Sequence, residues 1–339
     1  MSILSPMGWL YGRVADLRNT LYDKGVLESF DLGARTISIG NVTTGGTGKT
    51  PLVAYVAEIL AARGEKVCIL TRGYGRENAG QRVLVSDGKE ILADPSQAGD
   101  EPFELAQKLF GRALVIADAD RVAAAEWAKR KFGVTAFVLD DGFQYRKAKR
   151  DVDIVCIDAT NPFGGREMLP AGRLREPKFN LSRAGIVVIT RTNVAEDIAN
   201  IRFEISRLAP DSLVFAAENR IARIVALEEF HAKTQRPQSE EISQPALAFC
   251  GLGNPENFFA QLRQDGIEVV STETFRDHHR YFQQNIAGIE AKARQTGCEV
   301  LLTTAKDAVK LEGLVFTLPC YVVEIELSLD NPDGFAALI

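Results

Sequence analysis

The sequence predicts an α/β protein in which helices wrap a parallel sheet, followed by a second, smaller α/β domain. Short runs rich in valine, isoleucine and leucine recur without the alternation that a half-exposed strand shows, which is typical of strands covered on both faces. Helical stretches separate these runs, as in a parallel sheet. The runs of the first domain lie at residues 66–71, 113–117, 136–139, 154–158 and 186–190. A chain of 339 residues also exceeds what one core usually serves, which favours two domains.

A polar segment, R-P-Q-S-E-E-I-S-Q-P, ends at Pro245 and is typical of a connection between domains. Beyond it, apolar runs at 246–252, 268–272, 300–304 and 321–325 predict the strands of the smaller domain. We therefore expect the following division: an amphipathic helical region at 1–30, the main domain at 31–220, a linker at 221–244 and the smaller α/β domain at 245–339, closing on the main domain.

The composition is that of an ordinary soluble globular protein, with 46% hydrophobic and 25% charged residues. A net charge of −5 argues against a general nucleic-acid binder, which needs a large basic surface. The five cysteines are scattered without a C-x-x-C pair, which predicts reduced, buried thiols and a cytosolic protein. No run approaches the roughly 20 apolar residues of a membrane-spanning helix, and no export signal is recognisable.

A glycine-rich stretch at residues 37–51, I-S-I-G-N-V-T-T-G-G-T-G-K-T-P, joins a β-branched run to an amphipathic run at 52–62. A turn between a strand and a helix N-terminus leaves backbone N–H groups free to bind phosphate, so the stretch predicts a P-loop. Lys49 would reach the β and γ phosphates and Thr50 would hold Mg²⁺. Thr43 stands where the strict P-loop pattern has glycine, so the loop is a variant of that pattern. The alternative interpretation of the stretch is a glycine-rich turn that binds no ligand. The predicted nucleotide-binding residues are Thr44, Gly45, Gly46, Thr47, Gly48, Lys49 and Thr50.

The apolar run A-F-V-L-D-D ends in Asp140 and Asp141, as expected where an acid stands beside the Mg²⁺ of a P-loop. Adjacent strand residues face opposite sides, so one of the two should meet the metal more directly, and the pattern does not say which. Gln144 could add an oxygen ligand, directly or through water, and Glu176 is a third available carboxylate. Solvated turn acids are the alternative interpretation of the Asp pair.

Other chemistry-bearing residues lie in turns and bent loops. Asp100 and its neighbouring acid occur in G-D-E-P, and two of the three histidines, His278 and His279, occur in D-H-H. A carboxylate and a histidine together can activate a sugar or alcohol hydroxyl near neutral pH, although D-H-H could also be a metal site or a surface turn. The loops T-R-G-Y-G-R and L-P-A-G-R-L-R-E-P carry arginines suited to phosphate recognition. Arg121, which opens a predicted helix, is a further phosphate candidate.

The N-terminal segment has an apolar stripe at alternating spacings of three and four residues, which predicts an amphipathic helix. The stripe comprises Met7, Leu10, Val14, Leu17 and Leu21, flanked by Trp9 and Tyr11. The helix could pack on its own domain, or it could lie in a membrane interface with its apolar face in the bilayer surface. The residue pattern does not choose between the two.

Together these motifs resemble the tetraacyldisaccharide 4′-kinase family, the lipid A 4′-kinases of Gram-negative bacteria. The resemblance covers nearly the whole chain and includes the P-loop, T-R-G-Y-G-R, G-D-E-P, L-D-D-G-F-Q, L-P-A-G-R-L-R-E-P, G-L-G-N-P-E-N-F-F, D-H-H and K-D-A-V-K. It implies a P-loop NTPase-like core and transfer of the ATP γ-phosphoryl group to the 4′-hydroxyl of a tetraacylated glucosamine disaccharide 1-phosphate. It also implies a peripheral location at the cytoplasmic face of the inner membrane.

The resemblance also implies roles for individual residues. Asp100 would pair with a histidine of D-H-H, His278 in our interpretation, with His279 left open. The implied metal ligands are Thr50, Asp140, Asp141, Gln144 and Glu176. The implied contacts to the sugar or its 1-phosphate are Arg72, Tyr74, Arg121 and Arg175. The family tolerates a residue other than glycine at Thr43, and its lipid substrate favours the membrane interpretation of the first helix.

Two other functions remain as alternatives. A P-loop switch or regulatory ATPase would hydrolyse ATP without an acceptor and move its second domain against a protein partner. A kinase of a soluble small molecule would bury the apolar stripe of the first helix. For the leading hypothesis we expect a lipid substrate and a membrane surface as partners, and we infer no protein partner.

Overall fold

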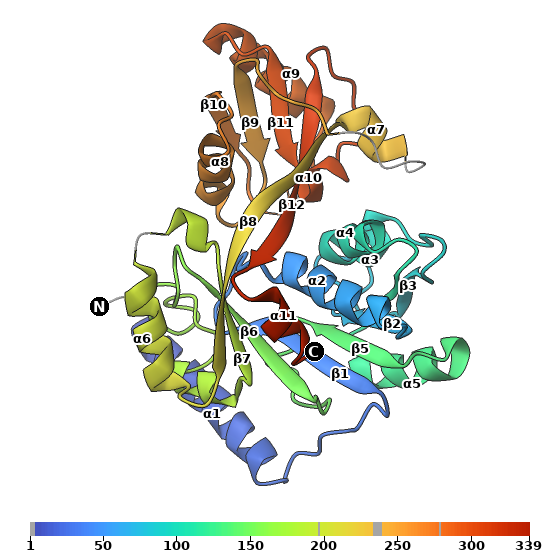
Figure 1. The fold of residues 1–339 in the computed structure, drawn as a ribbon, viewed down its shortest axis with the longest axis vertical. Coiled ribbons are helices and arrows are strands. Elements are labelled where there is room, and N and C mark those ends of the chain that lie inside the picture. The colour runs from blue at the N-terminus through green and yellow to red at the C-terminus, as the bar shows by residue number, and fades with distance from the viewer. Residues whose placement is uncertain (1–3, 196, 233–238, 278) are drawn as a thin grey trace. The chain divides into compact units, whose positions relative to one another are not determined.

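The computed structural model describes residues 4–195, 197–232, 239–277 and 279–339 and divides into two compact units (Figure 1). The first unit comprises Met1–Glu218 together with Leu327–Ile339, and the second comprises Asn219–Glu326. Two strands, β8 (Leu213–Ala226) and β12 (Cys320–Leu329), contain the unit boundaries, so the chain crosses from one unit to the other within strands.

The first unit is built on a parallel sheet with the strand order β8-β7-β6-β1-β5-β2-β4-β3. Neighbouring strands are parallel throughout except at the edge, where β3 runs antiparallel to β4. Its strands besides β8 are β1 (Arg35–Asn41), β2 (Val67–Thr71), β3 (Val83–Ser86), β4 (Ala113–Ala117), β5 (Ala136–Asp140), β6 (Val152–Asp158) and β7 (Ile186–Thr190). β2, β4, β5 and β7 are buried at every residue, because helices cover both faces. The prediction of a helix-wrapped parallel sheet is confirmed.

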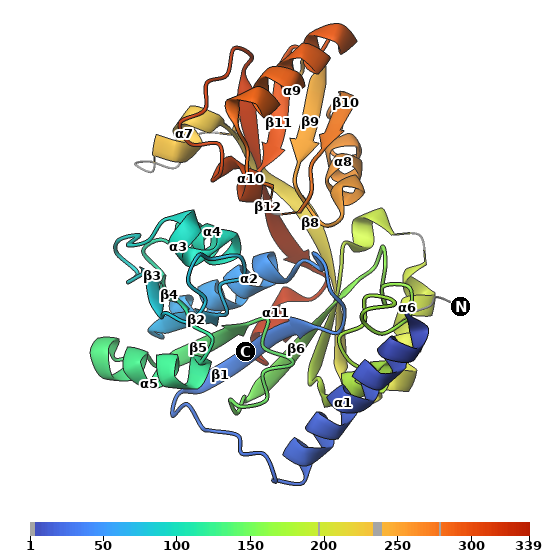
Figure 2. The same cartoon turned by 180° about the vertical axis from the view of Figure 1, so that it is seen from behind.

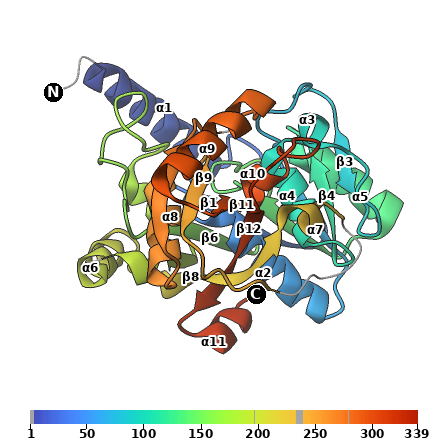
Figure 3. The same cartoon turned by 90° about the horizontal axis from the view of Figure 1, so that it is seen from above.

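The helices of the first unit pack on this sheet and continue the alternation of strand and helix along the chain. α2 packs against β1 and β5, α4 against β4 and α5 against β2, while α5 and α6 lie toward opposite ends of the sheet (Figures 1 and 3). The helices are α1 (Ser5–Asp23), α2 (Lys49–Ala62), α3 (Pro95–Ala98), α4 (Asp100–Lys108), α5 (Arg121–Phe132), α6 (Ile198–Leu208) and α11 (Pro332–Ala336), with the 3-10 helices η1 (Lys178–Arg183) and η2 (Thr192–Val194).

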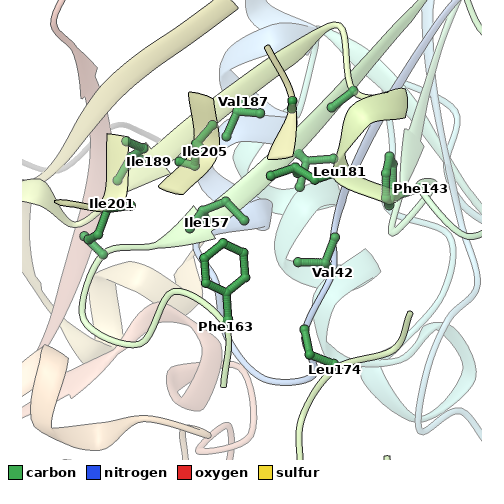
Figure 4. Close-up of a cluster of buried hydrophobic side chains, with 14 residues drawn as sticks. Val42, Phe143, Ile157, Phe163, Leu174, Leu181, Val187, Ile189, Ile201 and Ile205 are labelled. Atoms are coloured by element: carbon green, nitrogen blue, oxygen red, sulfur yellow. The ribbon is translucent and has the colours of Figure 1, made fainter. Parts of the chain in front are cut away.

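One hydrophobic cluster joins the sheet to the loops that carry the candidate site. Ile157 of β6 and Ile189 of β7 pack in it with Ile205 of α6 (Figure 4). Val42, which follows β1, and Leu174, in a loop before β7, belong to the same cluster. This packing fixes two loops at the carboxyl edge of the strands, where ligands bind in open parallel sheets.

The second unit has the strand order β10-β9-β11-β12-β8, and β10, β9, β11 and β12 pair in parallel. Its other elements are β9 (Ala246–Cys250), β10 (Val269–Thr274), β11 (Val300–Thr304), α7 (Leu227–Ala232), α8 (Pro255–Gln264), α9 (Gln283–Thr296) and α10 (Ala305–Ala308). Among the helices in the described part of the chain, none is long and apolar enough to cross a membrane.

The compact units divide the chain differently from the ranges expected from sequence. Residues 221–232 of the expected linker lie in β8 and α7, and residues 327–339 belong to the first unit rather than to the second. Aromatic packing accounts for the return of the C-terminus, because Phe335 of α11 is fully buried and its ring lies edge-on to Phe215 at 5.3 Å. The ring of Tyr55 lies 6.1 Å from that of Phe335 on another side.

Replacing Phe335 by alanine should therefore destabilise the first unit. The loss of a fully buried ring removes apolar burial and leaves a cavity, which costs about 3–5 kcal/mol. Phe203→Ala on α6 is the control, because that ring is 61% exposed, and should cost less than about 1 kcal/mol. Urea unfolding of the full chain measures both, and an equal loss for the two variants would contradict the packing role of α11.

Candidate active site

The glycine-rich loop runs from Asn41, the last residue of β1, to Lys49, the first residue of α2. Gly48 is the N-cap of α2 and has φ 77°, a left-handed conformation that favours glycine. A Cβ at Gly48 would also lie 3.3 Å from the side chain of Thr190. Strand, glycine turn and helix therefore follow in the order of a phosphate-binding loop.

Thr43 does not need the conformational freedom of glycine. Its φ is not positive, and it forms an isolated antiparallel bridge with Leu174. On either side of this bridge, the N–H of Thr44 donates to the carbonyl of Arg173 at 2.7 Å, and the N–H of Arg175 donates to the carbonyl of Val42 at 2.8 Å. The L-P-A-G-R-L-R-E-P loop thus lies directly against the P-loop.

The end of β7 supports the P-loop from another side. A loop that offers its N–H groups to phosphate needs partners for its carbonyl groups, because buried backbone polar groups must be paired. The Thr190 hydroxyl donates to the carbonyl of Thr47 at 2.9 Å, and Arg191 donates from Nη1 to the carbonyl of Gly46 at 2.6 Å. Arg191 also forms an ion pair with Asp158 at the end of β6. The sequence analysis did not single out Thr190, Arg191 or Asp158. Their position could have indicated a role, because polar residues at the carboxyl ends of apolar parallel strands often lie at a ligand site.

Asp140 and Asp141 stand at the carboxyl end of β5 in different environments. Asp140 ends the strand and accepts a hydrogen bond on Oδ2 from the Thr71 hydroxyl at 2.9 Å. Asp141 has a left-handed backbone, with φ 51°, and both its oxygens accept from Nη1 of Arg175, at 2.7 and 2.6 Å. Lys49 Nζ lies 3.6 Å from Asp141 Oδ1, so the P-loop lysine and the strand acids lie in one site.

These environments move the pKa values of the two acids in opposite directions. The pKa of Asp140 is raised to about 6, mainly by burial and also by the negative charges of Glu101 and Asp141. The charge of Lys49 and the hydrogen bond from Thr71 lower this pKa but do not cancel the rise. Burial also acts to raise the pKa of Asp141, but the cations of Lys49 and Arg175 outweigh it and lower the pKa to about 2. Asp141 is therefore ionised at any physiological pH, whereas Asp140 titrates near pH 6.

Glu176 is fully buried, and donors occupy both of its oxygens. Arg183 donates to them at 2.8 and 3.2 Å, Asn19 donates to Oε2 at 2.9 Å, and Gln144 donates to Oε1 at 2.7 Å. Gln144 Nε2 also donates to the carbonyl of Asn41. These contacts make Glu176 a junction between α1, the loop after β5 and η1, and its predicted contact to a metal stays a prediction.

The remaining acids suit magnesium bound together with phosphates. No group of three or more histidine, cysteine or acidic side chains is arranged for a metal within the described ranges of the chain. Mg²⁺ usually takes only one or two carboxylates from the protein and its other ligands from phosphates and water. Asp140, Asp141 and the first turn of α2, which contains Thr50, provide a donor set of that kind.

Two of the predicted substrate arginines belong to the same charged region. Arg121 is buried, with its guanidinium 4.5 Å from the centre of the Tyr145 ring. The pKa of Arg121 is lowered, mainly by burial and slightly by the positive charge of Arg72, while the charges of Asp141 and Asp140 oppose this change. Arg121, Arg72 and the two acids are therefore close enough to interact electrostatically. Arg72 is exposed.

The G-D-E-P and T-R-G-Y-G-R loops pack closely against each other. Asp100 is the first residue of α4, and the preceding Gly99 has φ 90°. A Cβ at Gly99 would lie 2.6 Å from the carbonyl oxygen of Tyr74, so only glycine permits this approach. The Tyr74 side chain is 72% exposed. Asp100 and Tyr74 are thus carried by neighbouring loops of the first unit.

The D-H-H motif belongs to the second unit, and His278 lies outside the described residues. Asp277 forms an ion pair with Lys306 at 2.8 Å. The His279 ring stacks on Phe275, with centroids 4.6 Å apart, and meets the Tyr281 ring edge-on at 4.9 Å. His279 therefore packs within an aromatic cluster, and the predicted pairing of Asp100 with His278 stays a prediction.

Comparisons with known proteins agree along the whole chain. A family model described as tetraacyldisaccharide-1-P 4′-kinase matches residues 1–339. The tetraacyldisaccharide 4′-kinase of Halothermothrix orenii is 38% identical, over 99% of this chain and 91% of that protein. That of an Anaeromyxobacter species is 42% identical, over 88% and 78% respectively. Among solved structures, LpxK from Aquifex aeolicus in complex with ATP superposes with a TM-score of 0.75 at 30% identity, covering 99% of this chain and 96% of that chain.

The raised pKa of Asp140 predicts a pH-dependent effect on stability. In the metal-free protein, folding takes up a proton at Asp140 between about pH 4 and 6, so its favourable contribution is present at low pH and lost as the pH rises through 6. Asp140→Asn should therefore gain stability relative to the wild type as the pH rises from 5 to 8, by about 1 kcal/mol. Urea unfolding at the two pH values measures the gain.

Asp94→Asn is the matched control. Hydrogen bonds from Ser96 and Gln97 hold the pKa of Asp94 below its usual range, so this exposed carboxylate is ionised at both pH values, and its replacement should change stability by the same amount at pH 5 and pH 8. If the stability difference between Asp140→Asn and the wild type were the same at pH 5 and pH 8, the pKa of Asp140 would not be raised in the folded protein.

Proposed function

The chain belongs to the tetraacyldisaccharide 4′-kinase family, and from this membership we propose that it transfers the γ-phosphoryl group of ATP to the 4′-hydroxyl of a tetraacylated glucosamine disaccharide 1-phosphate in lipid A biosynthesis. It is a kinase. The observation that carries the substrate proposal is a P-loop with Lys49 3.6 Å from Asp141, in a chain that matches the family over its full length.

ATP binds, in this proposal, along the P-loop residues 44–50 and the N-terminus of α2. The backbone N–H groups of that helix end favour the phosphates, and Lys49 reaches the transferred group. Thr190 and Arg191 hold the loop carbonyls and so keep the loop in shape for its ligand. The ATP complex of the Aquifex aeolicus relative supports ATP as the donor.

Mg²⁺ would be held by Thr50 and the Asp pair, and it would neutralise charge on the β and γ phosphates. We assign the more direct contact to Asp140. Both oxygens of Asp141 already accept from Arg175, whereas Asp140 accepts on Oδ2 alone among the contacts of the described residues. Glu176 is left out of this metal set because its donors come from the protein.

The acceptor hydroxyl would lose its proton to Asp100, which is carried on the G-D-E-P loop. Pairing with His278 would tune the basicity of Asp100, which stands at the N-terminus of α4, where the helix dipole stabilises the ionised carboxylate. Arg72, Tyr74 and Arg121 are proposed contacts to the sugar or its 1-phosphate. Arg175 is proposed to act nearer the transferred phosphate, since it binds Asp141 beside Lys49.

The first helix favours a substrate at a membrane surface. The apolar side chains of Met7, Leu10, Val14 and Leu17 are each 59–60% exposed, and Trp9 is 64% exposed. α1 instead buries Gly8, Gly12, Ala15 and Asn19. An exposed apolar stripe with aromatic flanks suits a helix lying in the bilayer interface at the cytoplasmic face of the inner membrane. The alternative hypothesis, a kinase of a soluble small molecule, predicts that this stripe is buried.

Asp100→Asn should lower kcat for the dispersed disaccharide 1-phosphate by about 10²- to 10⁴-fold, the usual contribution of a general base, with little change in the KM for ATP. Mass spectrometry of the lipid product measures the turnover. Lys108→Ala, at the far end of the same helix, should turn over like the wild type. An Asp100→Asn enzyme at full rate would exclude this residue as the base, and rapid ATP hydrolysis without an acceptor would favour a regulatory ATPase.

The double variant Leu10→Asp, Leu17→Asp should lose binding to vesicles, because two charges would have to leave water on the exposed face of α1. Flotation with vesicles of inner-membrane lipid composition measures the bound fraction. Phe203→Asp on α6 alters a ring that is 61% exposed on a different helix and should leave flotation unchanged. Equal flotation of the double variant and the wild type would mean that α1 is not the membrane contact.

A further inference from the structure

The buried carboxylate of Glu176 connects three elements that are far apart in sequence. Arg183 comes from η1, Gln144 from the loop after β5, and Asn19 from α1. A carboxylate with no exposed surface is stable only when charged and polar donors replace its lost water. Arg183 supplies the charge, and the two amides supply the remaining donors. The position of Glu176 therefore depends on the placement of α1.

α1 runs beside loops of the first unit (Figure 2), and it contacts the segment from Met168 to Glu176. Asn19 is one of the buried residues of this helix. Its side chain is only 2% exposed. On the same face, a Cβ at Gly8 would lie 2.9 Å from the carbonyl oxygen of Met168, and one at Gly12 would lie 3.3 Å from the Met168 side chain. The helix backbone thus approaches this segment closely, and Asn19 is the polar end of the contact.

A second contact fixes Asn19 through its backbone. Nη1 of Arg146 donates to the Asn19 carbonyl at 2.8 Å, and Nη2 forms an ion pair with Asp23 at 2.7 Å. Arg146 follows Gln144 in the loop after β5, the strand that carries Asp140. The side-chain N–H of Asn19 therefore binds one loop of the first unit and its backbone carbonyl binds another, while its Oδ1 has no hydrogen-bond partner among the described residues.

From Glu176 the contacts continue to the P-loop. Gln144, which donates to Glu176, also donates to the carbonyl of Asn41, where β1 enters the P-loop. Arg175, adjacent to Glu176, binds both oxygens of Asp141 through its side chain and Val42 through its backbone N–H. A shift of Glu176 would therefore move the partners of Asp141 and the support of β1 together.

We propose that Asn19 is a positioning residue of the nucleotide site: its amide fixes Glu176 and thereby holds Arg175 and Gln144 in the arrangement that Mg²⁺ and ATP require. Asn19 touches none of the reacting groups and acts through Glu176. The helix with the exposed apolar face is in this way also a structural part of the phosphate site. The proposal rests on the proposed function only in taking the P-loop as the ATP site.

Asn19→Leu keeps the approximate side-chain volume and removes the donor. Binding of a fluorescent ATP analogue with Mg²⁺ in the full-length protein should weaken at least fivefold, and the KM for ATP should rise in parallel. Thr20→Val is the matched control, because it removes a neighbouring hydroxyl whose hydrogen bond, among the described residues, stays within α1, at the carbonyl of Asp16. It should bind the analogue like the wild type. Analogue binding needs no lipid acceptor, so it tests the proposal separately from the kinase reaction.

Asn19→Asp gives a signature that loss of packing would not produce. The substitution keeps the shape of the side chain and places a second carboxylate beside Glu176, which repels it. Analogue binding relative to the wild type should therefore be at least as weak as in Asn19→Leu.

Three results would overturn the proposal. One is wild-type analogue affinity in a folded Asn19→Leu protein. Another is an equal loss in Thr20→Val, which would trace the effect to the helix as a whole. The third is an Asn19→Asp protein that binds the analogue like the wild type. Far-ultraviolet circular dichroism and a melting curve for each variant verify the fold, and the Asn19→Asp comparison decides the matter if Asn19→Leu does not fold.

Discussion

The candidate site depends on how the backbone of one short loop is hydrogen-bonded. A P-loop has few side chains to hold it, and its N–H groups are reserved for a ligand, so its shape must be fixed by contacts from elsewhere. Here the end of β7 binds the carbonyls of Gly46 and Thr47, and the segment around Leu174 pairs with the loop at Thr43. Both supports rest on the same hydrophobic cluster beneath the sheet edge, so core packing and ligand geometry are linked.

The sequence was most informative where the relevant residues are close together along the chain. The P-loop, the Asp pair after β5 and the parallel sheet could be predicted, because each rests on a local pattern of glycine, charge or apolar runs. The contacts of Glu176 could not, since its partner Asn19 stands 157 positions away and nothing in a local pattern brings the two together. The family resemblance implied a metal contact for Glu176, and the protein donors that surround this carboxylate could not be foreseen from it.

The first helix illustrates a different limit of periodicity. Spacings of three and four residues identify an apolar stripe, and in a soluble protein such a stripe is normally buried. In α1 four residues of the stripe, Met7, Leu10, Val14 and Leu17, are exposed and Leu21 is half-buried, and the buried side carries Gly8 and Gly12 instead. Glycine allows the helix backbone to approach a loop directly, so contact is gained without large side chains. Periodicity measures how side chains are distributed around a helix, but not which side meets the rest of the protein.

The division of the chain into units affects the order in which the protein can fold during synthesis. Residues 219–326 are inserted between the body of the first unit and its last thirteen residues, 327–339. A ribosome therefore exposes every element of the second unit before it releases α11, whose Phe335 completes the packing around Phe215 and Tyr55. The unit that holds the P-loop is therefore begun before the second unit and completed after it, so its packing around Phe335 cannot form until the second unit has been synthesised.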